Sequence, residues 1–262
     1  MDEIKKLKET ILKEYPRLNK ESKFKFDCHK NISCFNKCCS DVNIFLTPYD
    51  IIRLKNHLKI SSQEFLDKYT FLPIDENLNY PVVMLRMNQD ENKTCPFVGS
   101  DGCSVYGDRP WSCRMFPLGV ASPKENGGKD DEEFYFLLEE PVCQGCKEEK
   151  YWTINEWMND QKVKEYTEMG ELFKGISLHD YFTKNSKKLK PATLEMFYTV
   201  CYNIDKFREF VFESTFLKRF EVEKETVKKI KENDEELLKF GYGWLKYCLF
   251  GEQTMRLKEG KN

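Results

Sequence analysis

Several features that assign a chain to a common class of protein are missing from this sequence. No apolar run approaches the roughly 18–20 residues that a membrane-spanning helix needs. The first fifteen residues, MDEIKKLKETILKEY, are charged throughout and lack the apolar core of a secretory signal. We therefore expect a cytoplasmic protein with no membrane span.

Motifs of several enzyme classes are missing as well. There is no G-x-G-x-x-G loop after a strand and no Walker A sequence, which argues against an ordinary dinucleotide, Rossmann methyltransferase or P-loop site. The C-x3-C-x2-C arrangement of radical S-adenosylmethionine enzymes fails because Asp41 stands where a cysteine would have to follow Cys34 and Cys38. The bacterial ferredoxin run and the G-x-S-x-G nucleophile elbow are absent too. These absences argue against several types of reaction but do not indicate which reaction, if any, the protein performs.

Charge and composition exclude two further classes. The formal net charge is -2 with 33% charged residues, so nothing electrostatic favours a nucleic-acid partner. Hydrophobic residues make up 40% and aromatic residues 14% of the 262 positions, which is too apolar for a disordered chain. The length allows one large domain or two small ones. The sequence leaves the oligomeric state and the identity of a redox or protein partner open.

Cysteine is the residue that this sequence has in excess, with 11 in all. Two of them, Cys201 and Cys248, are isolated, and we expect them to be small buried hydrophobes. In a reducing cytoplasm, the many other thiols at short spacings indicate metal ligation, and the odd total fits a disulfide framework poorly. The predicted metal ligands are Cys28, Cys34, Cys38, Cys39, Cys95, Cys103, Cys113, Cys143 and Cys146.

The number of thiols bears on the kind of site. Thiolates are soft ligands that select zinc, copper(I) or iron–sulfur clusters. A structural zinc ion needs four ligands, and a [4Fe–4S] cluster takes four thiolates in most proteins. Nine cysteines therefore supply either two sites with one thiol left over, or one site plus a redox-active or open-site group.

Two of the spacings are informative. The adjacent residues Cys38 and Cys39 are poorly placed for a disulfide with each other, so either a sharply bent loop lets both bind one metal or they serve different metals. Cys143 and Cys146 have the spacing of a metal-binding knuckle, in which Gly145 permits a tight turn.

The segment before Cys113 carries polar and aromatic residues close to the thiol in sequence. Asp108-Arg109-Pro110 has the pattern of a cap and first turn of a short helix, and we favour a capping role for Asp108 and a core position for Trp111. A thiol there would lie near amide donors and near Arg109 or Arg114, which favours the thiolate. His29, beside Cys28, is either a ligand or an ordinary polar loop residue.

The pattern along the chain predicts an α+β fold in two regions. Turns and nine cysteines crowd residues 1–150, which we expect to form a small cysteine-rich metal-binding domain with few strands. Residues 151–262 have helical periodicity and are expected to form a mostly helical region packed on the first. Because irregular loops bury little apolar surface, the fold of the first region should depend on metal.

Local signals place individual elements. Residues 1–15 have the pattern of an amphipathic helix, and residues 122–131 that of a mobile loop. Residues 81–87 are expected to form a strand that pairs with residues 134–138. Three further helices are expected after capping signals: one after the N-cap Thr47, one over Ser61 to Tyr69 and one from the Thr153–Glu156 capping box. Another helix is expected from Pro191 through Val211, and a last helical region should end near Gly251.

The cysteine segments resemble the YkgJ-type cysteine-cluster family, described as zinc- or iron-chelating. The resemblance rests on FDCHKNISCFNKCCSDVNIFLTPYDIIRL, CPFVGSDGCSVYGDRPWSCRMFPLG and PVCQGC, and it covers about residues 24–150. Residues 201–220 also resemble the helical extension of a subgroup of that family. The same family is distantly similar to flagellin lysine-N-methylases, which implies a [4Fe–4S] centre at the nine matched cysteines and a methyl transfer from S-adenosylmethionine.

Three functions remain open at this point. The first is an iron–sulfur protein, of the [4Fe–4S] type, with a redox or cluster-dependent catalytic role. The second is a structural zinc protein that acts as an interaction module. The third, implied by the resemblance, is an S-adenosylmethionine-dependent protein-lysine methyltransferase.

Overall fold

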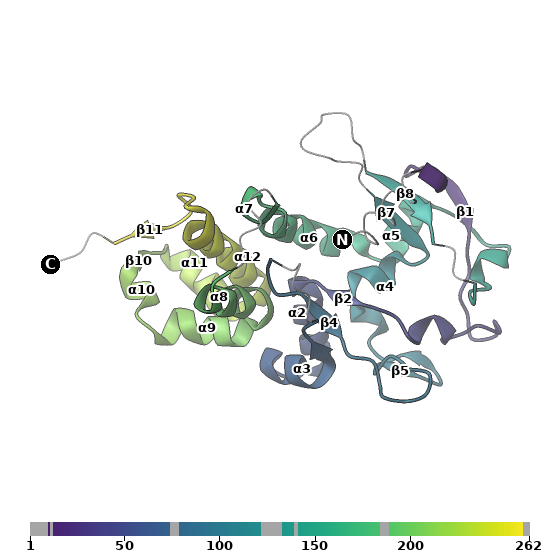
Figure 1. Cartoon of the computed structure of the whole chain (residues 1–262), viewed down its shortest axis with the longest axis horizontal. Helices are drawn as coiled ribbons and strands as arrows, with labels where there is room; N and C mark the ends of the chain where they lie inside the picture. Colours follow the sequence, from purple (N-terminus) through teal and green to yellow (C-terminus); the bar gives the residue numbers. More distant parts are fainter. Residues whose placement is uncertain are drawn as a thin grey trace. The chain divides into compact units, whose positions relative to one another are not determined.

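A computed structural model describes residue 10 and residues 13–73, 79–121, 133–138, 141–183 and 189–258 (Figure 1). About half of the chain is helical and the sheets have two or three strands, so the predicted α+β class is confirmed. The chain divides into two compact units, each built from three stretches. The cysteine unit comprises residues 1–42, 87–106 and 111–165, and the helical unit comprises residues 43–86, 107–110 and 166–262.

Small antiparallel ribbons make up the strands of the cysteine unit. β1 (Lys23–Lys25) pairs with β9 (Tyr151–Thr153), and β5 (Val98–Gly99) pairs with β6 (Gly102–Cys103). β7 (Leu118–Ala121) pairs with β8 (Phe134–Leu137), and Figure 1 shows this ribbon beside α5 (Ile154–Asp160). The other helical elements of this unit are η1 (Lys37–Cys39), α4 (Trp111–Met115) and η3 (Gly145–Lys147), with η2 (Tyr106–Asp108) at its border.

An apolar core joins these ribbons. Phe24 of β1 and Phe26, which follows this strand, meet Met115 of α4, Leu118 of β7 and Trp157 of α5, and all five side chains are buried. The rings of Phe26 and Trp157 meet edge to face, with centroids 5.2 Å apart. This core fixes the start of the segment that leads from β1 into Cys28.

One predicted strand pairing was wrong. β4 (Val83–Leu85) forms at the expected place but pairs with β2 (Phe45–Leu46) and β3 (Thr70–Phe71), whereas β8 pairs with β7. Every residue of β4 is buried, as expected of the central strand of a three-stranded sheet. The apolar pattern predicted the two strands, but pairing depends on which neighbours cover each strand.

Capping signals gave the correct starts of three helices. Thr47 caps α2 (Pro48–Leu58) through a capping box with Asp50, and Ser61 caps α3 (Ser62–Tyr69). Thr153 caps α5 through the predicted capping box with Glu156. In each case the hydroxyl oxygen accepts a hydrogen bond from a backbone N–H that has no partner within the helix.

The rest of the helical unit is a bundle of helices. Its elements are α6 (Val163–Ser177), which begins in the cysteine unit, and then α7 (Asp180–Thr183), α8 (Pro191–Tyr202), α9 (Ile204–Glu213), α10 (Phe216–Arg219), α11 (Lys224–Glu232), α12 (Asp234–Leu245) and the π-helical turn η4 (Lys246–Phe250). Figure 1 shows α8, α9, α11 and α12 side by side. Their shared core is aromatic, with Phe207 stacked on Trp244 at 5.8 Å between centroids.

Three expectations about this region need comment. Pro191 opens a helix as predicted, but Asn203 ends α8 and caps α9, so the single expected helix is two. Gly251, with φ at 71°, ends the last helical turn as predicted. Cys201 is buried as expected, but Cys248 is exposed, because the π turn η4 changes the angular spacing of side chains after α12.

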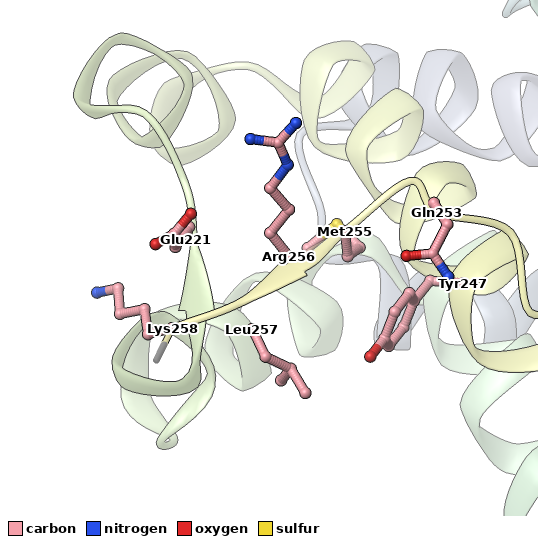
Figure 2. A pocket seen from close by; sticks show the side chains of 7 residues that line it. All are labelled: Glu221, Tyr247, Gln253, Met255, Arg256, Leu257 and Lys258. Carbon is pink, nitrogen blue, oxygen red and sulfur yellow. The ribbon is translucent and has the colours of Figure 1, made fainter. Parts of the chain in front are cut away.

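The chain end forms a short ribbon of β10 (Phe220–Glu221) and β11 (Arg256–Leu257). Figure 2 shows Glu221, Arg256 and Lys258 around an open pocket beside this ribbon. Within the described residues, no helix has the length and apolar character that crossing a bilayer requires. Of the expected helix over residues 1–15, only residues 10, 13 and 14 are described as helical; residues 1–9 and 11–12, like the expected loop at 122–131, lie outside the described residues.

Candidate metal centre

All nine predicted ligands belong to the cysteine unit, although they are spread over more than a hundred residues of sequence. The two cysteines that we did not predict as ligands, Cys201 and Cys248, belong to the helical unit. All eleven lie in the described part of the chain, and none of them forms a disulfide. The structure therefore places the nine predicted ligands in one unit and the two other cysteines in the other.

A first set of thiols forms around Cys28. The pKa of Cys28 is raised to about 11, first by burial of the sulfur and then by the charges that Cys38, Cys34 and Cys143 carry as thiolates. Cys34 is itself buried, and the backbone N–H of Gln144 donates a hydrogen bond to its sulfur at 3.2 Å. We call Cys28, Cys34, Cys38 and Cys143 the first set.

The predicted knuckle lies at the edge of this set. η3 turns the chain directly after Cys143, and the N–H groups of Gly145 and Cys146 lower the pKa of the Cys143 thiol against the larger effect of burial, which raises it. The residue Cys146 is exposed as a whole, but its sulfur is partly covered by protein. This partial burial and then the charge of Cys143 raise the pKa of the Cys146 thiol. Backbone donors aimed at sulfur favour the thiolate, which is the form that binds metal.

A second set of thiols forms around Cys39. Its pKa is raised strongly, first by a hydrogen bond with the Cys38 thiol, then by burial, and further by the charges of Cys38, Cys95 and Cys113. The pKa of Cys95 is raised by burial and by Cys103, and lowered by two backbone N–H donors in the turn that follows it. We call Cys39, Cys95, Cys103 and Cys113 the second set.

Backbone pairing holds the second set together. The N–H of Cys95 donates to the carbonyl oxygen of Cys39 at 2.8 Å, next to a bridge between Ser40 and Thr94. Cys103 lies opposite Val98 in the β5–β6 hairpin that begins three residues after Cys95. Strand pairing thus brings Cys39, Cys95 and Cys103 to one place.

The adjacent residues Cys38 and Cys39 connect the two sets. They end the 3-10 turn η1, which starts after Asn36 in a left-handed conformation with φ at 67°. In a 3-10 helix successive side chains are separated by about a third of a turn. The thiols of Cys38 and Cys39 nevertheless share a hydrogen bond, so the two sets meet at this pair.

The donor set fits a metal that prefers sulfur. Two groups of four thiols lie in one unit, with backbone N–H donors directed at the sulfurs of Cys34, Cys95 and Cys143. As they stand in the described residues, no three histidine, cysteine, aspartate or glutamate side chains converge on a single ion. The fit to such a metal therefore rests on the type of donor atom and on the presence of all these donors in one unit.

The polar residues near Cys113 have other contacts. The Asp108 carboxylate accepts hydrogen bonds from Arg53 and lies against the ring of His57, both on α2. The guanidinium of Arg114 is buried and donates to the carbonyl oxygen of Gln161 at 2.8 Å. Trp111 packs against the apolar core of the cysteine unit, as expected.

Two of the histidines lie against carboxylates. His29 lies 3.5 Å from the Glu148 carboxylate. His57 had no partner signature in the sequence, and its Nδ1 atom is 2.8 Å from Asp108. No local signal could have found this contact, because the two residues are 51 positions apart.

The comparisons with known proteins point to the same segment. Residues 27–144 match the family model CxxCxxCC, described as "Putative zinc- or iron-chelating domain". No curated protein and no solved structure gave a significant match. The family match agrees with the sequence resemblance and supports metal binding, with zinc or iron as the metal. Residues 27–144, which hold eight of the nine predicted ligands, are thus similar to the zinc- or iron-chelating cysteine-cluster domain.

Proposed function

We propose that the cysteine unit holds two metal centres, each bound by four thiolates. The first set would bind one centre and the second set the other, with Cys146 as a ninth thiol beside the first. One observation carries this proposal: the thiols that influence each other's pKa fall into two groups that meet at Cys38 and Cys39, one of them being the second set and the other the first set with Cys146 beside Cys143.

We propose further that the centres are iron–sulfur clusters of the [4Fe–4S] type with a redox role. Such clusters take four cysteine thiolates, which is the size of each set. Their potential depends on burial and on hydrogen bonds to the sulfurs, and backbone N–H groups already point at Cys34, Cys95 and Cys143. When bound, a cluster supplies one-electron chemistry, and the unit's own residues set its potential.

Zinc is the second candidate, favoured by the knuckle at Cys143. A Cys-x2-Cys turn with backbone donors to sulfur is a common half of a four-cysteine zinc site. In that case the cysteine unit would be a structural scaffold, and the function would lie in an interaction of the protein with a partner.

Metal analysis of protein purified without oxygen separates these two candidates. Iron and acid-labile sulfide in comparable amounts, with broad absorbance near ~400 nm and an electron-paramagnetic-resonance signal after reduction, would support clusters. Zinc in stoichiometric amount without sulfide would refute them.

Single substitutions test the assignment of thiols to two sets. Cys38→Ser and Cys39→Ser are each expected to remove one centre and about half of the metal, because each residue serves a different set. Cys201→Ser and Cys248→Ser are matched controls in the helical unit and should leave the metal content unchanged. Full metal content in both Cys38→Ser and Cys39→Ser would refute a ligand role for the adjacent pair.

The catalytic role that the family resemblance implies is methyl transfer from S-adenosylmethionine to a protein lysine. Calorimetric titration of the metal-loaded protein with S-adenosylmethionine tests it. Saturable binding would support this role, and absence of binding would leave the redox or structural role alone.

A further inference from the structure

The segment between Cys103 and Cys113 has an unusual place in the fold. Its flanking residues belong to the cysteine unit, but residues 107–110 belong to the helical unit. Asp108 stands at the middle, five residues after Cys103 and five before Cys113. Whatever holds Asp108 therefore acts on both of these thiols through short lengths of chain.

Two side chains from a single helix hold Asp108. Arg53 donates from Nε at 2.9 Å and from Nη2 at 2.6 Å to Oδ1 of Asp108, and His57 Nδ1 lies 2.8 Å from Oδ2. Arg53 and His57 are four residues apart on α2, so both project from the same face of the helix. Both oxygens of the carboxylate are thus engaged, and we call this arrangement the Asp108 clamp.

The helix that carries the clamp is well anchored. α2 begins with a capping box, and its residues Ile51 and Leu54 are fully buried. Arg53 also donates to the Tyr49 hydroxyl at 3.2 Å, and that hydroxyl is 3.1 Å from Glu235 at the start of α12. The clamp is therefore attached to the framework of the helical unit.

We propose that Asp108 is a positioning residue for the second set of thiols. By fixing the middle of the Cys103–Cys113 segment on α2, the Asp108 clamp restricts the conformations of the chain that joins these two thiols. A restricted segment loses less conformational entropy when its thiols bind a metal. This role rests on the proposed function of the second set as a metal centre.

The clamp is also open to solvent. Arg53, His57 and Asp108 line an open groove together with residues 232–235, which join α11 to α12. The side chains of Arg53 and Asp108 retain 30% and 23% of their exposure. Substitutions in the clamp therefore disturb no apolar core, which makes a selective test possible.

The test compares Arg53→Gln with Arg208→Gln in the full-length chain. Arg208 is a matched control because its guanidinium also binds a carboxylate of the helical unit, Asp234, but does not contact Asp108. In the metal-free protein, alkylation of each cysteine is followed by mass spectrometry. In the metal-loaded protein, the rate of metal release to a chelator is measured.

Selective change at the second set supports the proposal. Arg53→Gln should raise the alkylation rates of Cys103 and Cys113 about tenfold, the change expected when a charged hydrogen bond is lost, and should speed metal release. Cys28 and Cys34 should be unaffected, Arg208→Gln should change neither rate, and Arg53→Lys should be intermediate.

Equal effects of Arg53→Gln and Arg208→Gln, or no effect of Arg53→Gln, would overturn the proposal. If Arg53→Gln does not fold, His57→Gln, which removes only one contact of the clamp, provides the same comparison. A chain that binds no metal would refute the proposed function, whereas the alkylation rates would still decide whether the clamp restricts the segment.

Discussion

Adding a single methyl group at Gly145 is expected to reduce metal binding as well as the stability of the fold. A control substitution elsewhere in the unit should reduce stability alone. A Cβ atom added there would lie 2.7 Å from a ring carbon of Phe26 and 2.8 Å from the carbonyl oxygen of Asp27. The Phe26 ring can tilt, but the Asp27 carbonyl belongs to the backbone that leads directly into Cys28. That backbone is held in place because the Asp27 N–H donates a hydrogen bond to the Gly145 carbonyl oxygen at 3.1 Å. Gly145→Ala therefore forces the knuckle away from Cys28.

Overpacking of this kind costs about 1–3 kcal/mol. Because one of the two close contacts is with backbone, we expect the upper part of this range, about 2–3 kcal/mol, or a Tm lower by roughly 5–10 °C in a chain of this size. Since the displaced backbone carries Cys28 and Cys143 of the first set, the variant should also hold less metal. Thermal unfolding and metal analysis of the same samples measure both effects.

Gly119→Ala is the control for this experiment. A Cβ atom at Gly119 would clash with the ring of Phe136 across the β7–β8 ribbon, in the same unit but at no predicted ligand. It should lower stability to a similar extent and leave the metal content of the folded protein unchanged. Equal metal content in the Gly145→Ala and Gly119→Ala variants would contradict the idea that packing of the knuckle against Asp27 positions the first set.

Three further predictions concern the helical unit. Lys55→Met removes a buried ammonium group 2.9 Å from Asp234 and should lower the free energy of unfolding by about 3 kcal/mol in urea titrations; a loss below about 1 kcal/mol would contradict a buried ion pair. Burial raises the pKa of Asp234, but hydrogen bonds and charges from Lys55, Asn56 and Arg208 outweigh it and lower the pKa, so stability present above pH about 4 should fall as the pH drops further. Circular dichroism at 222 nm follows this loss, and Asp234→Asn should show a shallower acid dependence than the parent chain. Tyr242→Phe removes a buried hydroxyl that has no hydrogen-bond partner among the described residues, so stability in thermal unfolding should stay equal or rise by up to about 1 kcal/mol, and a clear decrease would reveal a hidden partner.

The parts of the fold that the sequence predicted correctly depend on neighbours along the chain. Thr47 and Thr153 each satisfy a backbone N–H three residues ahead, so the helix starts could be predicted from a few letters. Gly251 ends a helix because it adopts a positive φ, which is also a local property. Such signals need no knowledge of the rest of the structure.

The parts that were missed depend on distant residues. β8 pairs with β7 and not with β4, and Asn203 splits an apolar helix whose periodicity runs through it. Asn203 does so because its side chain bonds both Ser62 and Gln63 at the start of α3, some 140 residues earlier. The Asp108 clamp is of the same kind, since Asp108 is more than fifty positions from Arg53 and His57 in the sequence.

The candidate metal centre lies between these two cases. Cysteine spacing predicted a set of metal ligands but left open how they would divide between sites, because spacing gives no distance across loops. The division into two sets that we propose rests on pKa coupling between thiols and on backbone contacts such as that between Cys39 and Cys95. Since one peptide bond links the two sets, a ligand lost from one set frees the turn that also positions the other. Occupancy of the two proposed centres should therefore be coupled, with the second metal held less tightly after the first has left.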